Sequence, residues 1–259
     1  MIDLQKLCEV AKEAAIAAGE EILNIYHSGD FSIEAKADNS PLTLADKAAH
    51  HKIESFLSKT GLPILSEEGR DIPFEERKGW EYFWMVDPLD GTKEFIKKNG
   101  EFTVNIALIH NDESILGVVY PPVLNELYWA IKGSGSFKLH NDETQQIRSS
   151  EKMMNAPSLK VVASRSHMSQ ETQDFVDELD SPEIVSKGSS LKFLLVASGA
   201  ADVYPRFGPT MEWDTAAAHV IVSEAGGSVL LEDQESQLSY NKENLLNPYF
   251  IVLPFQIDK

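Results

Sequence analysis

Residues 84–92, with the sequence Trp-Met-Val-Asp-Pro-Leu-Asp-Gly-Thr, constrain this chain more than any other segment. The apolar residues from Tyr82 to Val86 predict a buried strand, and Pro88 interrupts it. Asp87 and Asp90 lie at the interruption, and Gly91 allows a tight turn into the next element. The segment therefore predicts two carboxylates at the end of a buried strand.

Such carboxylates are costly to bury unless a cation pairs with them. Hard divalent ions take oxygen ligands of this kind. A helix that begins near Thr92 would direct backbone N–H groups at the same place, which suits an anion. Metal ligands beside an anion site indicate chemistry on a phosphate, although Asp-Pro and Asp-Gly are also ordinary turn dipeptides.

Two further carboxylates occur in similar positions. Glu67 follows a short predicted strand at 63–66, where the alternative is a solvated loop. Asp214 lies near the start of a predicted helix, where the alternative is a favourable charge at the helix N-terminus worth ~0.3–1 kcal/mol. The conjunction of three carboxylate sites, each at the end of an element beside apolar sequence, favours a metal site over three separate turns.

The composition excludes several classes of protein. The 259 residues include 42% hydrophobic and 25% charged residues, as in a globular protein with a substantial core. The net charge of -18 disfavours binding to a nucleic-acid polymer or an anionic membrane. No apolar run approaches the ~20 residues of a membrane span, and no signal segment is expected. The single cysteine, Cys8, excludes an internal disulfide and indicates a cytoplasmic protein. Homodimerisation and loose association with the inner membrane stay open.

Periodicity predicts an α+β protein with two sub-domains. We expect a long helix over 3–27, an edge strand over 31–37, and a second helix that Thr43 caps and that ends near Ser58. The next strands form an antiparallel meander over 102–109, 114–119, 126–131 and 136–139. The polar stretch 140–158 predicts a boundary, which divides the chain into 1–150 and 151–259. The second part has predicted helices over 169–179, 189–199 and 213–225, and strands over 161–163, 201–204 and 251–253.

Three motifs together resemble the signatures of the inositol monophosphatase superfamily. They are Ser66-Glu67-Glu68, Asp87-Pro-Leu-Asp90-Gly-Thr92, and Trp213-Asp214 with Ala225-Gly226-Gly227. The resemblance spans nearly the whole chain, with the motifs in the expected order. It implies a layered α/β/α/β/α sandwich and a lithium-sensitive, magnesium-dependent phosphomonoesterase.

Other segments resemble one subfamily, the CysQ-type 3'(2'),5'-bisphosphate nucleotidases. They are 36–46, 93–96, 164–167, 188–192 and 204–209. The resemblance implies removal of the 3'-phosphate from adenosine 3',5'-bisphosphate to give AMP. That substrate is a by-product of sulfate assimilation and of phosphopantetheine transfer, so a role in its recycling is implied.

The resemblance also implies roles for individual residues. Two or three Mg²⁺ ions would bind the side chains of Glu67, Asp87, Asp90 and Asp214 and the carbonyl of Leu89. A water activated by metal and oriented by Glu67 and Thr92 would attack phosphorus, while Thr92 pairs with Asp46. The implied substrate contacts are Leu89, Asp90, Gly91, Thr92, Ser164, His167, Ser189, Lys192, Arg206 and Asp214.

Several alternatives stay open at this point. The substrate is a nucleotide bisphosphate in one reading and an inositol phosphate or a sugar bisphosphate in another. The chain could also be an inactive, metal-dependent binding protein. Ser164 and His167 would otherwise belong to a polar loop, and Lys192 and Arg206 to the solvated surface. His50 and His51 lack the companion residues of a zinc motif, so a structural role is expected for them.

Overall fold

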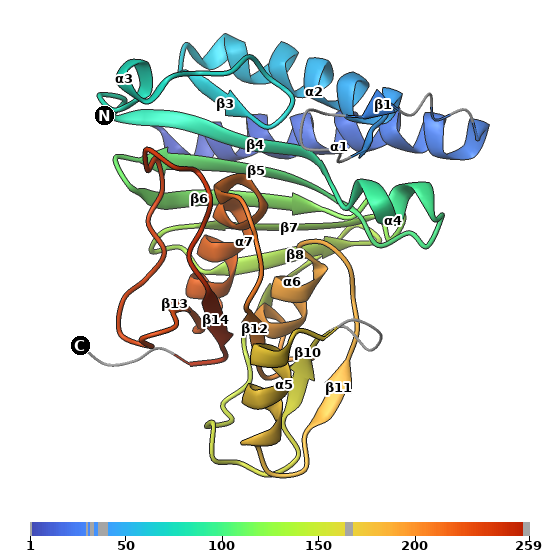
Figure 1. Ribbon diagram of the computed structural model, residues 1–259. Helices are drawn as coiled ribbons and strands as arrows, with labels where there is room; N and C mark the ends of the chain where they lie inside the picture. Colours follow the sequence, from blue (N-terminus) through green and yellow to red (C-terminus); the bar gives the residue numbers. More distant parts are fainter. Residues whose placement is uncertain (1, 30, 32–33, 36–40, 164–167, 256–259) are drawn as a thin grey trace.

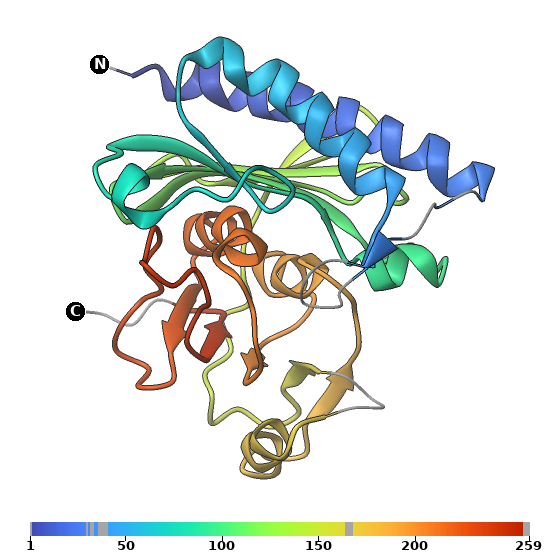
Figure 2. The ribbon, with the colours of Figure 1, turned by 45° about the horizontal axis from the view of Figure 1, so that its top comes forward.

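The computed structural model describes residues 2–29, 31, 34–35, 41–163 and 168–255 (Figure 1). Its first layer is a pair of long helices, α1 (Leu4–Ser28) and α2 (Leu44–Leu57), which lie side by side on one face of a sheet (Figures 1 and 2). Asp3 caps α1, which ends at Gly29 with a φ of 78°. Thr43 caps α2, as its hydroxyl side chain predicted.

The second layer is a seven-stranded sheet with the order β3-β4-β5-β6-β7-β8-β9. The strands are β3 (Ile64–Ser66), β4 (Tyr82–Asp90), β5 (Thr103–His110), β6 (Glu113–Tyr120), β7 (Glu126–Ile131), β8 (Ser136–His140) and β9 (Glu143–Ile147). β3 runs parallel to β4, and each later strand is antiparallel to the one before it. The predicted meander is confirmed, and β9 extends it into the polar stretch expected to be a boundary.

The third layer consists of α6 (Leu191–Ala197) and α7 (Glu212–Glu224), on the other face of the sheet (Figure 1). Here α7 approaches β6 so closely that a side-chain carbon at Gly117 would meet the Ala217 carbonyl oxygen. Apolar residues of both halves of the chain form one core between this sheet and α7, among them Phe83, Ala107 and Val220. The helix that carries Asp214 is thereby fixed against the sheet that carries Asp87.

The fourth and fifth layers come from the second half of the chain. A three-stranded antiparallel sheet has the order β12 (Tyr204–Arg206), β14 (Phe250–Leu253), β13 (Ser228–Leu231). Nearby, β10 (Lys160–Val162) pairs in parallel with β11 (Glu183–Val185). The helix α5 (Gln170–Asp177) covers this region (Figure 1). The succession of helices and sheets is the α/β/α/β/α sandwich that the motifs implied, so the predicted fold class is confirmed.

Some local predictions need correction. The strand β4 continues through Pro88 to Asp90, because a bulge accommodates the proline. The predicted edge strand over 31–37 is represented by β1 (Glu34–Ala35), paired with β2 (Pro41–Leu42), while 32–33 and 36–40 lie outside the described residues. The strands β11 and β13 were not predicted. Short helical turns occur at η1 (Ser58–Thr60), α3 (Phe74–Arg77) and α4 (Thr92–Ile96).

The division into 1–150 and 151–259 stays a prediction. Within the described residues, no helix combines the length and the apolar character that crossing a membrane would require.

Candidate active site and metal centre

Three carboxylates from separate elements meet where β3 ends beside β4 in the large sheet. Glu67 follows β3 and Asp87 lies on the parallel strand β4, where the backbone N–H of Glu67 donates to the Val86 carbonyl oxygen over 3.1 Å. Asp214 lies in the first turn of α7. One oxygen from each of these three carboxylates lies within 4.8 Å of the other two. The structure therefore brings together the acidic groups of all three sequence motifs.

A bulge in β4 sets the direction of a fourth carboxylate, that of Asp90. Asp87 pairs with Asn105, and the next pair joins Asp90 to Thr103, so β4 has one extra residue between them. The Asp87 carboxylate accepts a hydrogen bond from the Leu89 N–H at 3.0 Å, which stabilises the turn of the chain. Pro88 cannot donate to the sheet ladder, and the bulge is where such a residue is tolerated.

Burial, and then the proximity of like charges, raises the proton affinity of two of these carboxylates, Asp87 and Asp214. Burial, followed by the negative charges of Glu67 and Asp90, raises the pKa of Asp87 well above its ordinary value. Burial and the charges of Asp90 and Glu67 raise the pKa of Asp214 to about 8. A bound cation would remove the repulsion, and the donor set consists of oxygen atoms, as Mg²⁺ prefers. The residues present therefore fit the magnesium site that the motifs implied.

A hydroxyl–carboxylate pair lies beside this cluster. Asp46 is buried, and one of its oxygens accepts from the backbone N–H of Thr43 at 2.8 Å, in the capping box of α2. The other oxygen accepts from the Thr92 hydroxyl at 3.1 Å. Thr92 is the first residue of α4 and follows Gly91, whose φ is 97°. The predicted pairing of Asp46 with Thr92 is present, and it connects α2 to the end of β4.

Two residues to which the sequence assigned no role, Asn105 and Ser190, support Asp90. The buried side chain of Asn105 donates to the Ser190 hydroxyl at 2.9 Å and accepts from the Thr103 hydroxyl at 3.0 Å. The Ser190 hydroxyl lies 2.9 Å from an Asp90 carboxylate oxygen and 3.0 Å from the Asp214 carbonyl oxygen. The available signal was the polar residue Asn105 inside a mainly apolar strand.

Of the ten residues expected to contact substrate, Leu89, Asp90, Gly91 and Thr92 lie at the end of β4 and the start of α4. Ser189, Lys192 and Arg206 line one small pocket together with Asp90 and Asp214. Ser164 and His167, in contrast, lie outside the described residues.

Within this pocket, the conformation of Ser189 is unusual. Its φ is 44°, and its buried hydroxyl has no hydrogen-bond partner among the described residues. Arg206 donates to the Thr210 hydroxyl at 2.7 Å, and its charge favours the ionised form of Asp214, which partly offsets the upward shift in that pKa.

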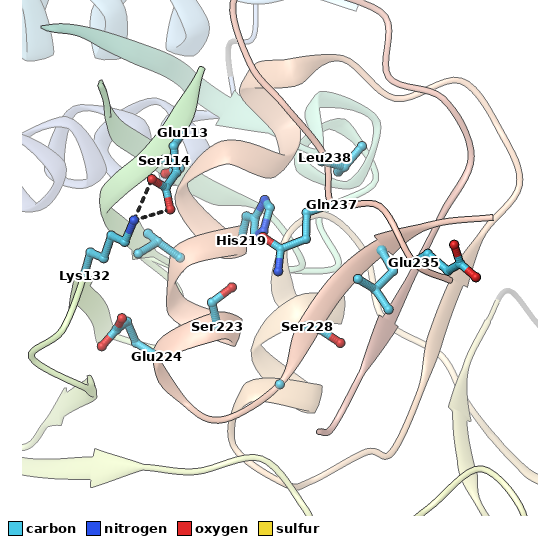
Figure 3. A pocket seen from close by; sticks show the side chains of 13 residues that line it. Glu113, Ser114, Lys132, His219, Ser223, Glu224, Ser228, Glu235, Gln237 and Leu238 are labelled. Carbon is cyan, nitrogen blue, oxygen red and sulfur yellow. Dashed lines mark hydrogen bonds and ion pairs between the residues drawn. The ribbon is translucent and has the colours of Figure 1, made fainter. Parts of the chain in front are cut away.

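A larger cavity of about 700 Å³ lies at the other end of α7 (Figure 3). Three of its charged side chains, Glu113, Lys132 and Glu224, are engaged with one another or with the backbone. Lys132 contacts Glu113 at 2.6 Å, and Glu224 accepts from the backbone N–H groups of Gly133 and Gly135 at 2.8 Å. The small pocket beside Asp214, rather than this larger cavity, is next to the carboxylate cluster and is the candidate site.

Comparisons with known proteins extend over nearly the whole chain. A relative from Escherichia coli K12, "3'(2'),5'-bisphosphate nucleotidase CysQ", is 46% identical over 254 residues, which cover 96% of this chain and 98% of the relative. A relative of the same name from Haemophilus influenzae is 34% identical and covers 92% of this chain and 89% of its own. The solved structure of CysQ from Bacteroides thetaiotaomicron is 46% identical, with a TM-score of 0.86 and 98% coverage of both chains.

A more distant fold neighbour is the extragenic suppressor protein SuhB from Bartonella henselae, at 26% identity and a TM-score of 0.78, covering 95% of this chain and 93% of its own. The model of the Inositol monophosphatase family matches residues 3–249. With its sandwich fold and its carboxylate cluster, the chain belongs to the inositol monophosphatase family.

Proposed function

We propose that this chain is a magnesium-dependent 3'(2'),5'-bisphosphate nucleotidase, which converts adenosine 3',5'-bisphosphate to AMP and phosphate. The observation that carries the proposal is the convergence of Glu67, Asp87 and Asp214 within 4.8 Å, next to the pair Asp46–Thr92. Relatives named as nucleotidases of this kind, at 46% identity over almost the full length, support the choice of substrate.

The metal ligands in this proposal are Glu67, Asp87, Asp90, Asp214 and the Leu89 carbonyl, for two or three Mg²⁺ ions. Bound magnesium supplies positive charge that activates water and stabilises the charge developing on the phosphate. The protein supplies the placement, since β3 pairs with β4 and α7 packs against the same sheet, which holds the carboxylates together. Asn105 and Ser190 hold Asp90 in its orientation.

Protons move through the chain's own groups. The Thr92 hydroxyl donates to Asp46 and has lone pairs that can accept a proton from the attacking water. As Thr92 accepts that proton it passes its own to Asp46, which acts as the base through the hydroxyl. Glu67 orients the same water. The backbone N–H groups of Gly91 and Thr92 hold the phosphate while it reacts.

The remaining substrate contacts recognise the nucleotide. Ser189, Lys192 and Arg206 line the pocket that opens beside Asp90, and Ser164 and His167 complete the set. Arg206 and Lys192 supply positive charge for the second phosphate in a protein whose net charge is -18. The substrate is a small nucleotide in the cytoplasm, and the enzyme would recycle a by-product of sulfate assimilation.

The test is phosphate release from adenosine 3',5'-bisphosphate with magnesium, with EDTA, and with magnesium plus lithium. We expect release of the 3'-phosphate that needs magnesium and that lithium suppresses. Inositol 1-phosphate and a sugar bisphosphate serve as comparison substrates. Faster hydrolysis of either would overturn the substrate and keep the phosphatase, and no release from the whole set would indicate an inactive binding protein.

A further inference from the structure

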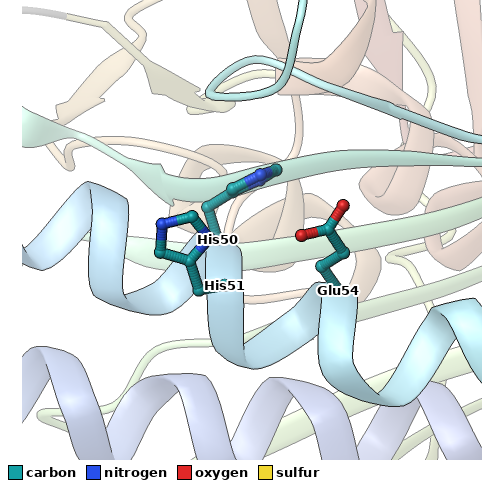
Figure 4. Close-up of side chains that lie close together, drawn as sticks. All are labelled: His50, His51 and Glu54. Atoms are coloured by element: carbon teal, nitrogen blue, oxygen red, sulfur yellow. The ribbon is translucent and has the colours of Figure 1, made fainter.

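Two groups of His, Cys, Asp or Glu side chains in the described part of the chain bring three ligand atoms within 4.8 Å of one another. One is the carboxylate cluster of the candidate active site. The other is His50, His51 and Glu54 on α2 (Figure 4). This second group contains two imidazoles, so its chemistry differs from that of the carboxylate cluster.

The helix explains why these three side chains meet. Glu54 follows His50 by four positions and His51 by three, and residues at both spacings are neighbours on a helix surface. A single carboxylate is therefore within reach of both rings, whose centroids lie 5.3 Å apart. His51 and Glu54 are exposed, so an ion from solvent has access to the group.

His50 has a partner from a different element, which the sequence alone did not reveal. Its Nδ1 lies 3.0 Å from the hydroxyl of Ser66, the last residue of β3. Histidine ligands commonly have their second ring nitrogen engaged in this way, which fixes the ring and its tautomer. A Ser66 hydroxyl that accepts from Nδ1 leaves the lone pair of Nε2 for a metal.

From this geometry we propose that His50, His51 and Glu54 form a second metal site, for a first-row transition ion of the Zn²⁺ or Cu²⁺ class. Imidazole nitrogen favours these ions over Mg²⁺, which prefers oxygen. Three protein ligands leave further positions to water, as in an open zinc site. The site does not depend on the proposed nucleotidase activity, because none of its ligands belongs to the carboxylate cluster.

The binding experiment is calorimetric titration of the full chain with Zn²⁺ in excess magnesium, which occupies the oxygen ligands. We expect one site, and we expect His51→Ala and Glu54→Gln to weaken its affinity by at least about tenfold. Ser66→Ala should weaken it by about tenfold through loss of the orienting bond. His27→Ala is the matched control, because His27 is an exposed helical histidine outside the group. The Zn²⁺ affinity of this variant should equal that of the wild type.

A spectroscopic measurement separates the two sites directly. Cu²⁺ bound to His50 and His51 should give an electron paramagnetic resonance spectrum with nitrogen hyperfine splitting, which an all-oxygen carboxylate site cannot produce. Asp87→Asn should keep this signal and His51→Ala should diminish it. A signal or a Zn²⁺ affinity that is unchanged in His51→Ala, or that is lost in Asp87→Asn, would overturn the proposal.

Discussion

Asp46 uses its two carboxylate oxygens for different purposes. One completes the capping box of α2, and the other accepts from Thr92. The sequence predicted the cap and its helix from local spacing alone. Local spacing could not place Thr92 against Asp46, because 46 residues separate them. The pairing was implied only by the resemblance to the family, and the packing of the chain brings it about.

The first prediction concerns this pair. Asp46→Asn should lower kcat by about 10²–10⁴-fold, because the amide cannot take the proton that Thr92 passes on. The amide oxygen can still accept in the cap, so the thermal midpoint should change little. Steady-state kinetics and thermal unfolding check both parts, with Thr92→Ser as a control that keeps the hydroxyl. Near-normal turnover in Asp46→Asn would remove it from the proton path.

A second prediction at this scale separates ligand positioning from substrate binding. Ser190→Ala removes the hydroxyl that contacts Asp90, so the magnesium concentration for half-maximal activity should rise by about 10–100-fold. Ser189→Ala should instead raise the KM for the nucleotide and leave the magnesium requirement unchanged. Magnesium titrations of activity in both variants check the difference. A Ser190→Ala enzyme with a normal magnesium requirement would show that the Asp90 carboxylate holds its orientation without this bond.

At the scale of elements, the contact between β6 and α7 places the helix that carries Asp214. Gly117 lies where the strand meets the helix backbone, and a methyl group there would meet the carbonyl of Ala217. The strand β6 and the helix α7 were both predicted. The contact between them was not predicted, because a glycine within a strand, such as Gly117, also fits a bulge or a turn.

Gly117→Ala should therefore lower the free energy of unfolding by about 1–3 kcal/mol through overpacking. It should also weaken magnesium binding, because a displaced α7 moves Asp214. Gly79→Ala is the matched control, since a side-chain carbon there meets no atom within 4 Å. Urea unfolding of both variants tests the prediction, and equal stabilities would show that the β6–α7 contact can yield without cost.

At the scale of the whole molecule, the carboxylate cluster lies where the large sheet meets α7 of the second half of the chain. The repulsion among its negative charges exists only in the folded state, because folding brings the carboxylates together. Asp214 has a folded pKa of about 8, against an ordinary value of 3.8. Between these values the folded state holds a proton that the unfolded state has released, so the stability of the metal-free protein falls as pH rises from about 4 to about 8.

The matching prediction is that magnesium raises the thermal midpoint more at pH 8.5 than at pH 5. The ion binds the ionised cluster and stabilises the folded state by about 2.7 kcal/mol at a concentration of 100 times its Kd. Asp214→Asn should flatten the pH dependence measured in EDTA. An equal rise in the thermal midpoint at both pH values would contradict the repulsion among the ionised carboxylates of the cluster.

The sequence by itself determined most of the helices and strands and the chemistry available to them. The Thr43 cap, the apolar run before Asp87 and the strand-forming runs of the meander are local patterns, and local patterns report local structure. The acidic motifs also indicated the family and a metal-dependent reaction. These inferences needed only neighbouring residues, and so they did not depend on the packing of the chain.

The tertiary structure alone decided the contacts that neither a local pattern nor the family resemblance implied. The bulge at Pro88, the support of Asp90 by Asn105 and Ser190, and the contact of His50 with Ser66 each depend on register or packing between separate elements. The strand β9 was missed because its exposed residues carry no apolar alternation. Distances between residues far apart in the chain are set by the core as a whole, and no local period encodes them.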